Sequence, residues 1–236
     1  MLEEIKMNEK LKILLLGILA GLSISFGSAA YIACAIYANR ILGSILFSIG
    51  LLIICAFGFK LYTGQIGKVF ENKKEFILDL LIMLFGNFIG AMGAGLLASF
   101  TNVEGNYTDV VMAVGNSKLI TAGGGSVTWY ALLIQSLFCG MLVYFAVEIY
   151  KFGKDNVTKV LGLIMAVAAF VVSGHSHCIA NMYYLGVSRL FITNFGWTLL
   201  SLLISIIGNS CGAILINLLM RFAFKKRQTS DSDFIQ

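Results

Sequence analysis

The chain has 236 residues, of which 58% are hydrophobic and only 12% are charged. Soluble domains carry about 25% charged residues, so this composition excludes a soluble fold and predicts an integral membrane protein. The formal net charge of +5 does not indicate a nucleic-acid partner, because the basic residues gather at the ends of apolar segments.

Six apolar segments follow one another along the chain, each close to the roughly 20 residues that cross a bilayer. They cover about residues 13–37, 41–70, 76–100, 126–148, 157–187 and 193–220. The first is too long for the core of a signal peptide, so we expect it to be retained. No soluble domain fits beside these segments. We therefore expect one transmembrane domain over residues 1–236, with halves at about 13–100 and 126–220, a polar loop at 101–125 and a short tail at 225–236.

Basic residues are divided unevenly between the two sides of this arrangement. The termini and the second and fourth connections share one side, which carries Lys6, Lys10, Lys12, Lys68, Lys73, Lys74, Lys151, Lys154, Lys159, Arg221, Lys225, Lys226 and Arg227. The opposite side carries Arg40, Lys118 and Arg189. Positive residues are retained in the cytoplasm, so the pattern predicts that both termini are cytoplasmic.

Polar runs that contain glycine interrupt the second and fifth segments. The first run is FGFKLYTG at 57–64, and the second is SGHSHCIANM at 173–182, which holds the only two histidines of the chain. Proline is absent, so glycine and polar residues must break these helices. The backbone of such a break needs partners from protein or from water in a cavity. Ionisable residues at this depth mark pathways, and we interpret 173–182 as the middle of a transport pathway.

A short motif occurs once in each half. The third segment contains GNFIGA at 86–91 and the sixth contains GNSCGA at 208–213, each after the interrupted segment of its own half. Three crossings separate the copies, so they run in opposite directions. This predicts an inverted repeat with two broken helices and a permeation site between the halves. Spaced glycines also predict close helix packing at the pairs Gly17/Gly21, Gly86/Gly90 and Gly208/Gly212.

Four of these segments resemble the formate/nitrite transporter family. GHSHCIANM resembles the family's G-x-x-H-S-x-A-N-M motif, FGFKLYTG resembles its second-crossing loop, and LFGNFIGA and IIGNSCGA resemble its third and sixth crossings. The resemblance covers about residues 15–225. It implies an all-α membrane protein of six transmembrane helices, an aquaporin-like inverted repeat with the second and fifth helices broken. It also implies a homopentamer in the lipid bilayer with one pore per protomer, carrying formate, nitrite, hydrosulfide or, in some members, lactate.

The same resemblance assigns roles to individual residues. It makes His177 the central histidine of the pore, Thr63 the loop threonine and Leu61 a gate beside it. The remaining residues that it places along the pathway are Phe47, Leu51, Phe170 and Val143 as constriction residues and Lys118 as the lysine that attracts anions.

The chain departs from the family pattern at three positions. Gly140 stands where the family usually has an asparagine, Lys60 replaces a common acid, and Ser176 replaces a glutamate before the histidine. We expect Gly140 to line the pore and Lys60 to attract anions. These changes resemble the hydrosulfide-channel branch, so we expect a channel for hydrosulfide, with formate and nitrite as further substrates. A proton-coupled formate or nitrite transporter is the alternative.

The residues alone leave several roles open. His177 is either a pore group, donating a hydrogen bond or a proton, or a core histidine bonded to a carbonyl. His175 is two residues away, so the two would not share a face of a regular helix. Residues 41–59 already span about 28 Å as a helix, so Lys60 fits the cytoplasmic mouth as well as the pore. Lys118 also fits an ordinary loop lysine.

Two other classes of protein are compared with this interpretation. Aquaporins need Asn-Pro-Ala boxes, and the chain has no proline. A membrane metalloenzyme would use His175, His177 and Cys178, but the apolar segments offer almost no carboxylates to complete such a site. We therefore expect no catalytic residues, no metal and no cofactor, and a multi-pass protein of a bacterial inner membrane.

Overall fold

The computed structural model describes residues 8–101 and 106–231. In this part of the chain the regular elements are helices, and one isolated β-bridge joins Ile120 and Val127. The helices are α1 (Glu9–Tyr37), α2 (Arg40–Phe57), α3 (Tyr62–Gln65), η1 (Ile66–Glu71), α4 (Glu75–Ala98), α5 (Asn106–Asn116), η2 (Thr121–Gly123), α6 (Trp129–Phe152), α7 (Asn156–Val172), α8 (Cys178–Val187), α9 (Leu190–Thr193) and α10 (Phe195–Asp231). The all-α prediction is confirmed.

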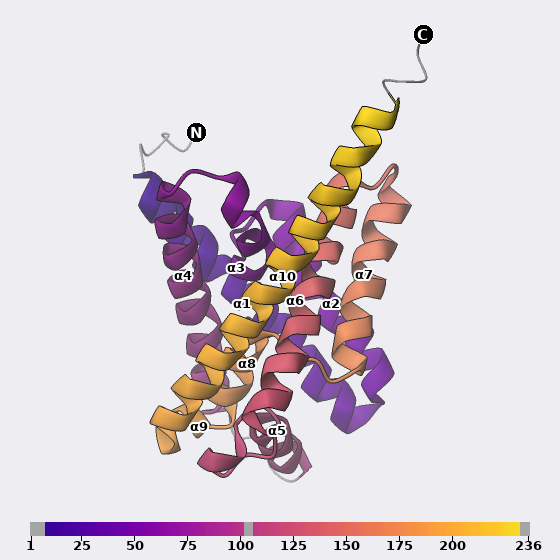
Figure 1. Ribbon diagram of the computed structural model, residues 1–236. Coiled ribbons are helices and arrows are strands. Elements are labelled where there is room, and N and C mark those ends of the chain that lie inside the picture. Colours follow the sequence, from indigo (N-terminus) through magenta and orange to yellow (C-terminus); the bar gives the residue numbers. More distant parts are fainter. Residues whose placement is uncertain (1–7, 102–105, 232–236) are drawn as a thin grey trace, which may run out of the picture.

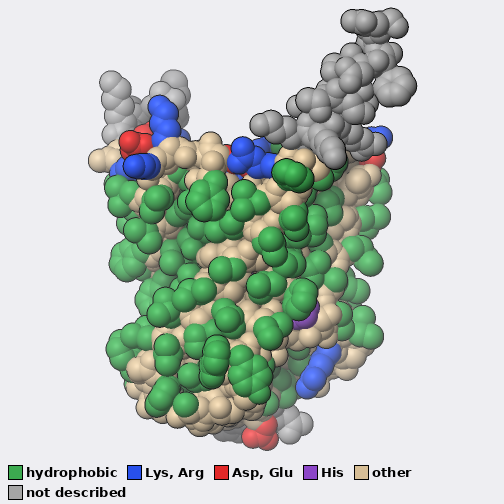
Figure 2. Space-filling model, viewed as in Figure 1, with side chains coloured by type: hydrophobic (Ala, Val, Ile, Leu, Met, Phe, Trp, Pro, Cys, Tyr) green, Lys and Arg blue, Asp and Glu red, His purple; other side chains and the backbone are tan. Residues whose placement is uncertain are grey.

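Five of the described helices are long and apolar enough to cross a membrane: α1, α2, α4, α6 and α10. Helices α7 and α8 are apolar but shorter, with 17 and 10 residues. On the face seen in Figure 2, hydrophobic side chains cover the side of the bundle, and most of the visible charged side chains gather at the end where α1 begins and α10 leaves (Figures 1 and 2). This distribution is the one expected of a bundle whose sides face lipid or another protein subunit.

The predicted loop at 101–125 contains regular structure, which corrects that expectation. Helix α5 lies in it and packs against α1 and α8. Its apolar residues Val110, Val111 and Val114 recur at helical spacing and join the main core. This periodic face outweighs the polar composition of the surrounding segment, because burying it stabilises a helix that would be marginal alone. Residues 102–105 of the predicted loop lie outside the described residues.

The glycine pairs of α1 and α4 face one another. A Cβ atom at Gly21 would lie 2.4 Å from the carbonyl oxygen of Asn87, and one at Gly90 would lie 2.2 Å from that of Ile18. The two backbones are therefore in direct contact, as the spacing of Gly17/Gly21 and Gly86/Gly90 predicts.

Helices α6 and α10 meet in the same way. A Cβ atom at Gly212 would lie 2.0 Å from the carbonyl oxygen of Leu137, and one at Gly140 would lie 2.1 Å from that of Asn209. Gly140 therefore packs against α10, and its missing side chain allows the two helices to approach closely.

Candidate functional site

The break in the second half of the chain places His177 at the start of a short helix. Helix α7 ends at Val172, Gly174 turns the chain at φ 75°, and α8 begins at Cys178. His177 is the N-cap residue of α8, and its Nδ1 atom accepts a hydrogen bond of 3.3 Å from the backbone N–H of Ala180. The histidine thereby satisfies one of the free N–H groups in the first turn.

The break in the first half is built in the same way. Helix α2 ends at Phe57, Gly58 turns the chain at φ 71°, and α3 begins at Tyr62 with Leu61 as its N-cap. One sequence offset relates the two breaks, pairing Gly58 with Gly174, Lys60 with Ser176, Leu61 with His177 and Tyr62 with Cys178. Left-handed backbone at both turns explains the two glycines, which adopt it without steric cost.

Asn87, from the first GNxxGA motif, holds the first break in place. Its side-chain oxygen accepts from the N–H of Tyr62 at 2.8 Å. Its amide nitrogen donates to the carbonyl oxygens of Gly17 at 2.8 Å and Lys60 at 2.9 Å. One buried side chain thus joins α1, α4 and the break.

Asn209, from the second motif, makes the matching bonds in the second half. Its oxygen accepts from the N–H of Cys178 at 2.8 Å. Its amide nitrogen donates to the carbonyl oxygens of Ser136 at 2.7 Å and Ser176 at 2.9 Å. The sequence analysis found this motif but not the role of its asparagine, and the signal for it was the polar residue retained in both copies.

Thr63 and His177 meet between the two short helices. The Oγ1 atom of Thr63 lies 2.9 Å from Nε2 of His177, and the two residues are 0% and 3% exposed. Because Nδ1 accepts from Ala180, the neutral ring carries its proton on Nε2 and donates it to the threonine hydroxyl. The imidazole therefore has a defined tautomer, with both nitrogens engaged.

A cavity of about 410 Å³ lies on one side of His177, between α2, α5, α6 and the second break. Lys118, Arg40 and His175 line it, and Phe47 and Phe170 lie at the edge that it shares with His177. Lys118 is mostly buried, and burial lowers the pKa of its amine to about 8. The cavity is thus a basic compartment that ends at an aromatic pair.

A closed apolar region lies on the other side of His177. It leaves no volume for a water molecule. Its lining residues are Ile24, Phe47, Leu51, Leu61, Val143, Val167, Phe170 and His177. The rings of Phe47 and Phe170 meet edge to face at 5.8 Å, and Phe170 lies 6.0 Å from the His177 ring. This region is dry and narrow enough to act as a constriction.

The structure brings together most of the residues singled out in the sequence. Phe47, Leu51, Leu61, Phe170, Val143 and His177 line the constriction, Thr63 contacts His177, and Lys118 lines the basic cavity. Gly140 and Lys60 line neither space. Ile24, Val167 and Arg40 were missed. Ile24 and Val167 sit in uniformly apolar helices that give no local signal, whereas Arg40 is one of three cations on its side of the chain.

The two histidines have different surroundings. His175 stacks on Phe138 with ring centroids 5.6 Å apart, whereas His177 binds Thr63. Among the described residues no group of three or more His, Cys, Asp or Glu is arranged to hold a metal ion. Nothing in this arrangement joins His175, His177 and Cys178 into a metal site.

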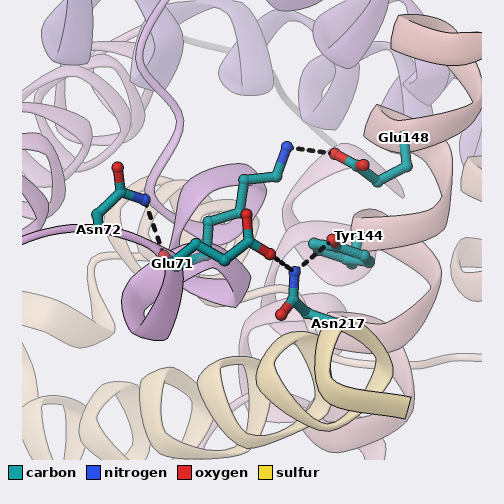
Figure 3. A network of polar contacts seen from close by, with 6 residues as sticks. Glu71, Asn72, Tyr144, Glu148 and Asn217 are labelled. Carbon is teal, nitrogen blue, oxygen red and sulfur yellow. Dashed lines mark hydrogen bonds and ion pairs between the residues drawn. The ribbon is translucent and has the colours of Figure 1, made fainter. Parts of the chain in front are cut away.

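A polar network at the charged end of the bundle anchors η1, which directly follows α3 (Figure 3). Lys68 forms an ion pair with Glu148 of α6. Asn217 of α10 donates to the Glu71 carboxylate and, at 2.8 Å, to the Tyr144 hydroxyl. These bonds tie η1 to the second half of the chain and so help to hold α3 beside α8.

The chain is similar to known transport proteins. The family profile described as "Formate/nitrite transporter" matches residues 2–223. The uncharacterized transporter YrhG of Bacillus subtilis is 28% identical over 212 residues, which are 84% of this chain and 77% of that protein. The formate channel FocA of Haemophilus influenzae is 24% identical over 157 residues, 61% of this chain and only 52% of its own length.

A solved structure described as a pentameric formate channel with formate bound has the same fold. It superposes with a TM-score of 0.72 at 23% sequence identity, covering 94% of this chain and 98% of that one. At this level of identity the likeness concerns the fold.

Proposed function

The chain belongs to the formate/nitrite transporter family, and from that premise we propose that it is a membrane channel for small monovalent anions. One arrangement carries the proposal: the His177–Thr63 pair stands between a basic cavity and a dry apolar constriction. The chain's relatives in this family are channels and transporters, so the chain is a transport protein and not an enzyme.

The proposed architecture has six crossings: α1, α2 with α3, α4, α6, α7 with α8, and α10. In this view the second and fifth crossings are broken helices, and the two halves form an inverted repeat within one domain. The matching bonds of Asn87 and Asn209 support the repeat, because they connect equivalent atoms in both halves. The gathering of charged side chains at one end supports a cytoplasmic position for both termini, in a bacterial inner membrane.

The basic cavity would concentrate the anion before it enters the constriction. Lys118 and Arg40 line this cavity, and cationic walls raise the local concentration of an anion by electrostatic steering. The N-terminus of α8 points its dipole toward the same region, since His177 caps it and also lines the cavity. An anion thus approaches His177 through a favourable potential.

The constriction presents the energetic barrier. An anion that sheds water in an apolar passage needs replacement hydrogen bonds. Nε2–H of His177 can exchange its bond with Thr63 for one with the anion, and the freed threonine hydroxyl can donate as well. We propose that His177 acts as a neutral donor, because Nδ1 is already an acceptor for Ala180 and a second ring proton would break that cap.

The relatives, and not the departures in sequence, suggest which anion to test first. Two departures that suggested hydrosulfide, Gly140 and Lys60, line neither the cavity nor the constriction. Relatives of the chain include formate channels, so formate is the first anion to test, with hydrosulfide and nitrite beside it. Proton-coupled transport of formate or nitrite is the competing mechanism, and it requires His177 to exchange a proton.

We also propose a homopentamer. A related solved channel is pentameric, and large apolar side chains such as Phe26, Phe85 and Phe138 are exposed on the single protomer. Native mass measurement in detergent tests the assembly, and a stable conducting monomer would contradict it.

Flux into proteoliposomes tests the function itself. Formate, hydrosulfide, nitrite and chloride are compared over a pH series, with empty vesicles as the baseline. We expect flux of at least one of the first three that is lost when a bulky side chain closes the constriction, as in Val143→Trp. The proposal fails if purified, folded protein passes none of these anions above the baseline.

A further inference from the structure

Lys118 is a cation without a counter-charge in the part of the chain that the structure describes. Its amine forms no ion pair there, and none of the residues that line its cavity is acidic. Burial lowers its pKa to about 8, so a large part of the amine is still charged near neutral pH. A buried charge is stable only when it is paired, so this position favours a bound anion.

His175 lies in the same cavity and also lacks a partner. Its ring stacks on Phe138, and its Nδ1 atom is buried with no hydrogen bond within the described residues. Lys118 and His175 line the same cavity. A buried ring nitrogen without a partner is costly, and a ligand or a bound water would satisfy it.

We propose that Lys118 and His175 together form a second anion site in the basic cavity, separate from the His177–Thr63 pair. The ammonium group supplies the charge and the imidazole supplies one directed hydrogen bond. The ligand is a small monovalent oxyanion such as formate. The cavity of about 410 Å³ is large enough for such an ion together with water molecules that hydrate the rest of it. This inference rests on the proposed function for its ligand class. It assigns to His175 a task distinct from that of His177: holding an ion before the constriction.

The site binds an anion in the cavity before that anion enters the constriction. An anion held at Lys118 and His175 stays outside the dry constriction, so it keeps part of its hydration. The site therefore affects how readily the channel fills at low substrate and has little effect on the barrier at Phe47 and Phe170. Half-saturation and maximal flux should separate these two effects.

The first measurement is formate flux against formate concentration for wild type, His175→Phe and Lys118→Gln. His175→Phe keeps an aromatic ring that can stack on Phe138 and removes both ring nitrogens, at the cost of a slightly larger ring. For His175→Phe we expect the half-saturating formate concentration to rise roughly fivefold, the factor that one hydrogen bond is worth, with maximal flux unchanged. Lys118→Gln should raise the half-saturating concentration as well. The double variant should show less than the product of the two single effects, because both residues bind the same ion.

The second measurement does not depend on transport. A ligand that binds only the folded protein raises its melting temperature, so sodium formate is compared with sodium gluconate at equal ionic strength in detergent. Wild type should be stabilised by formate, and His175→Phe should lose most of that effect. Arg189→Gln is the matched control, since Arg189 is a cation on the same side whose guanidinium donates to the Ser99 carbonyl and does not line the cavity.

The outcomes distinguish the two proposals. Formate-dependent stabilisation that needs His175 and Lys118, in a protein without flux, supports the anion site and contradicts the channel. Flux with no formate-dependent stabilisation, or a His175→Phe protein with wild-type half-saturation and wild-type stabilisation, overturns the anion site and leaves the channel.

Discussion

The hydroxyl oxygen of Thr63 lies 2.9 Å from Nε2 of His177, although 114 positions separate the two residues in the sequence. Each residue is near the start of a short helix, and each helix follows a glycine turn in its own half of the chain. The centre of the proposed pathway is therefore a contact between the halves, and neither half contains it alone.

The role of His177 is tested with His177→Asn, which keeps a hydrogen-bond donor and removes the titrating ring. If the ring acts as a neutral donor, formate flux should fall by less than about tenfold, the value of one hydrogen bond, and its pH profile should stay that of wild type. Flux between about pH 6 and pH 8 is the measurement, because an ordinary histidine titrates in this range. Loss of the pH-dependent component in the variant would assign proton transfer to His177, and a fall in melting temperature with unchanged flux would make it a core residue.

The flux of the proposed channel should depend on alkaline pH through Lys118. Burial lowers the pKa of its amine to about 8, so the amine is charged below that pH and becomes neutral as pH rises through it. Formate stays ionised throughout, and its flux at low concentration and low salt should therefore decline between about pH 7 and pH 9.

Two variants control for other titrating groups in the same range. Lys118→Arg keeps its charge at every pH tested and should remove the decline, while Lys118→Gln should give low flux at all pH values. A Lys118→Arg protein with the same decline as wild type would show that another group causes it.

Asn209 and Asn87 should matter for stability more than an exposed asparagine such as Asn72. Asn209→Ala removes three buried hydrogen bonds and leaves the N–H of Cys178 without its partner, so the free energy of unfolding should fall by at least about 2 kcal/mol. Asn87→Ala should cost a similar amount for the same reason. Thermal melting in detergent measures both, with Asn72→Ala, at an exposed position with one bond, as the control. Equal melting temperatures for Asn209→Ala and Asn72→Ala would contradict this role.

The glycine contacts allow a matched comparison along the helices. Gly212→Ala places a Cβ atom 2.0 Å from the Leu137 carbonyl oxygen and should destabilise the protein by about 1–3 kcal/mol through overpacking. Gly93→Ala is the control, because nothing lies within 4 Å of its Cβ position and alanine favours the helix by about 1 kcal/mol. Melting temperature and folded yield should fall for the first variant and hold or rise for the second. The reverse order would exclude a tight contact between α6 and α10.

The sequence predicted those features that depend only on the residues of one continuous segment. Apolar length predicted the helices, and the polar, glycine-containing runs lie where α2 and α7 end and α3 and α8 begin. The motif around His177 directed attention to the centre of the site. Such signals come from short stretches of sequence, so they can be interpreted without knowing how the helices pack.

The direction in which a side chain points, and the helix that it faces, could not be predicted in the same way. Gly140 lies three residues before Val143, yet a Cβ there points at α10 while Val143 faces the constriction. Spacing along a helix does not say where the neighbouring helix approaches closely. The pair of Lys68 with Glu148 was missed for a related reason, since the two residues come from distant segments that only folding brings together.

The two asparagine clusters also bear on how the chain is made. Among the described residues, the side chain of Asn87 bonds to Gly17, Lys60 and Tyr62, all in the first hundred residues, and that of Asn209 bonds to Ser136, Ser176 and Cys178. The first broken segment can therefore satisfy these backbone groups as soon as α4 has been synthesised, while the second half is still on the ribosome. These bonds allow the first half to shield those backbone groups from lipid without the C-terminal half. The contact between Thr63 and His177, in contrast, requires both halves.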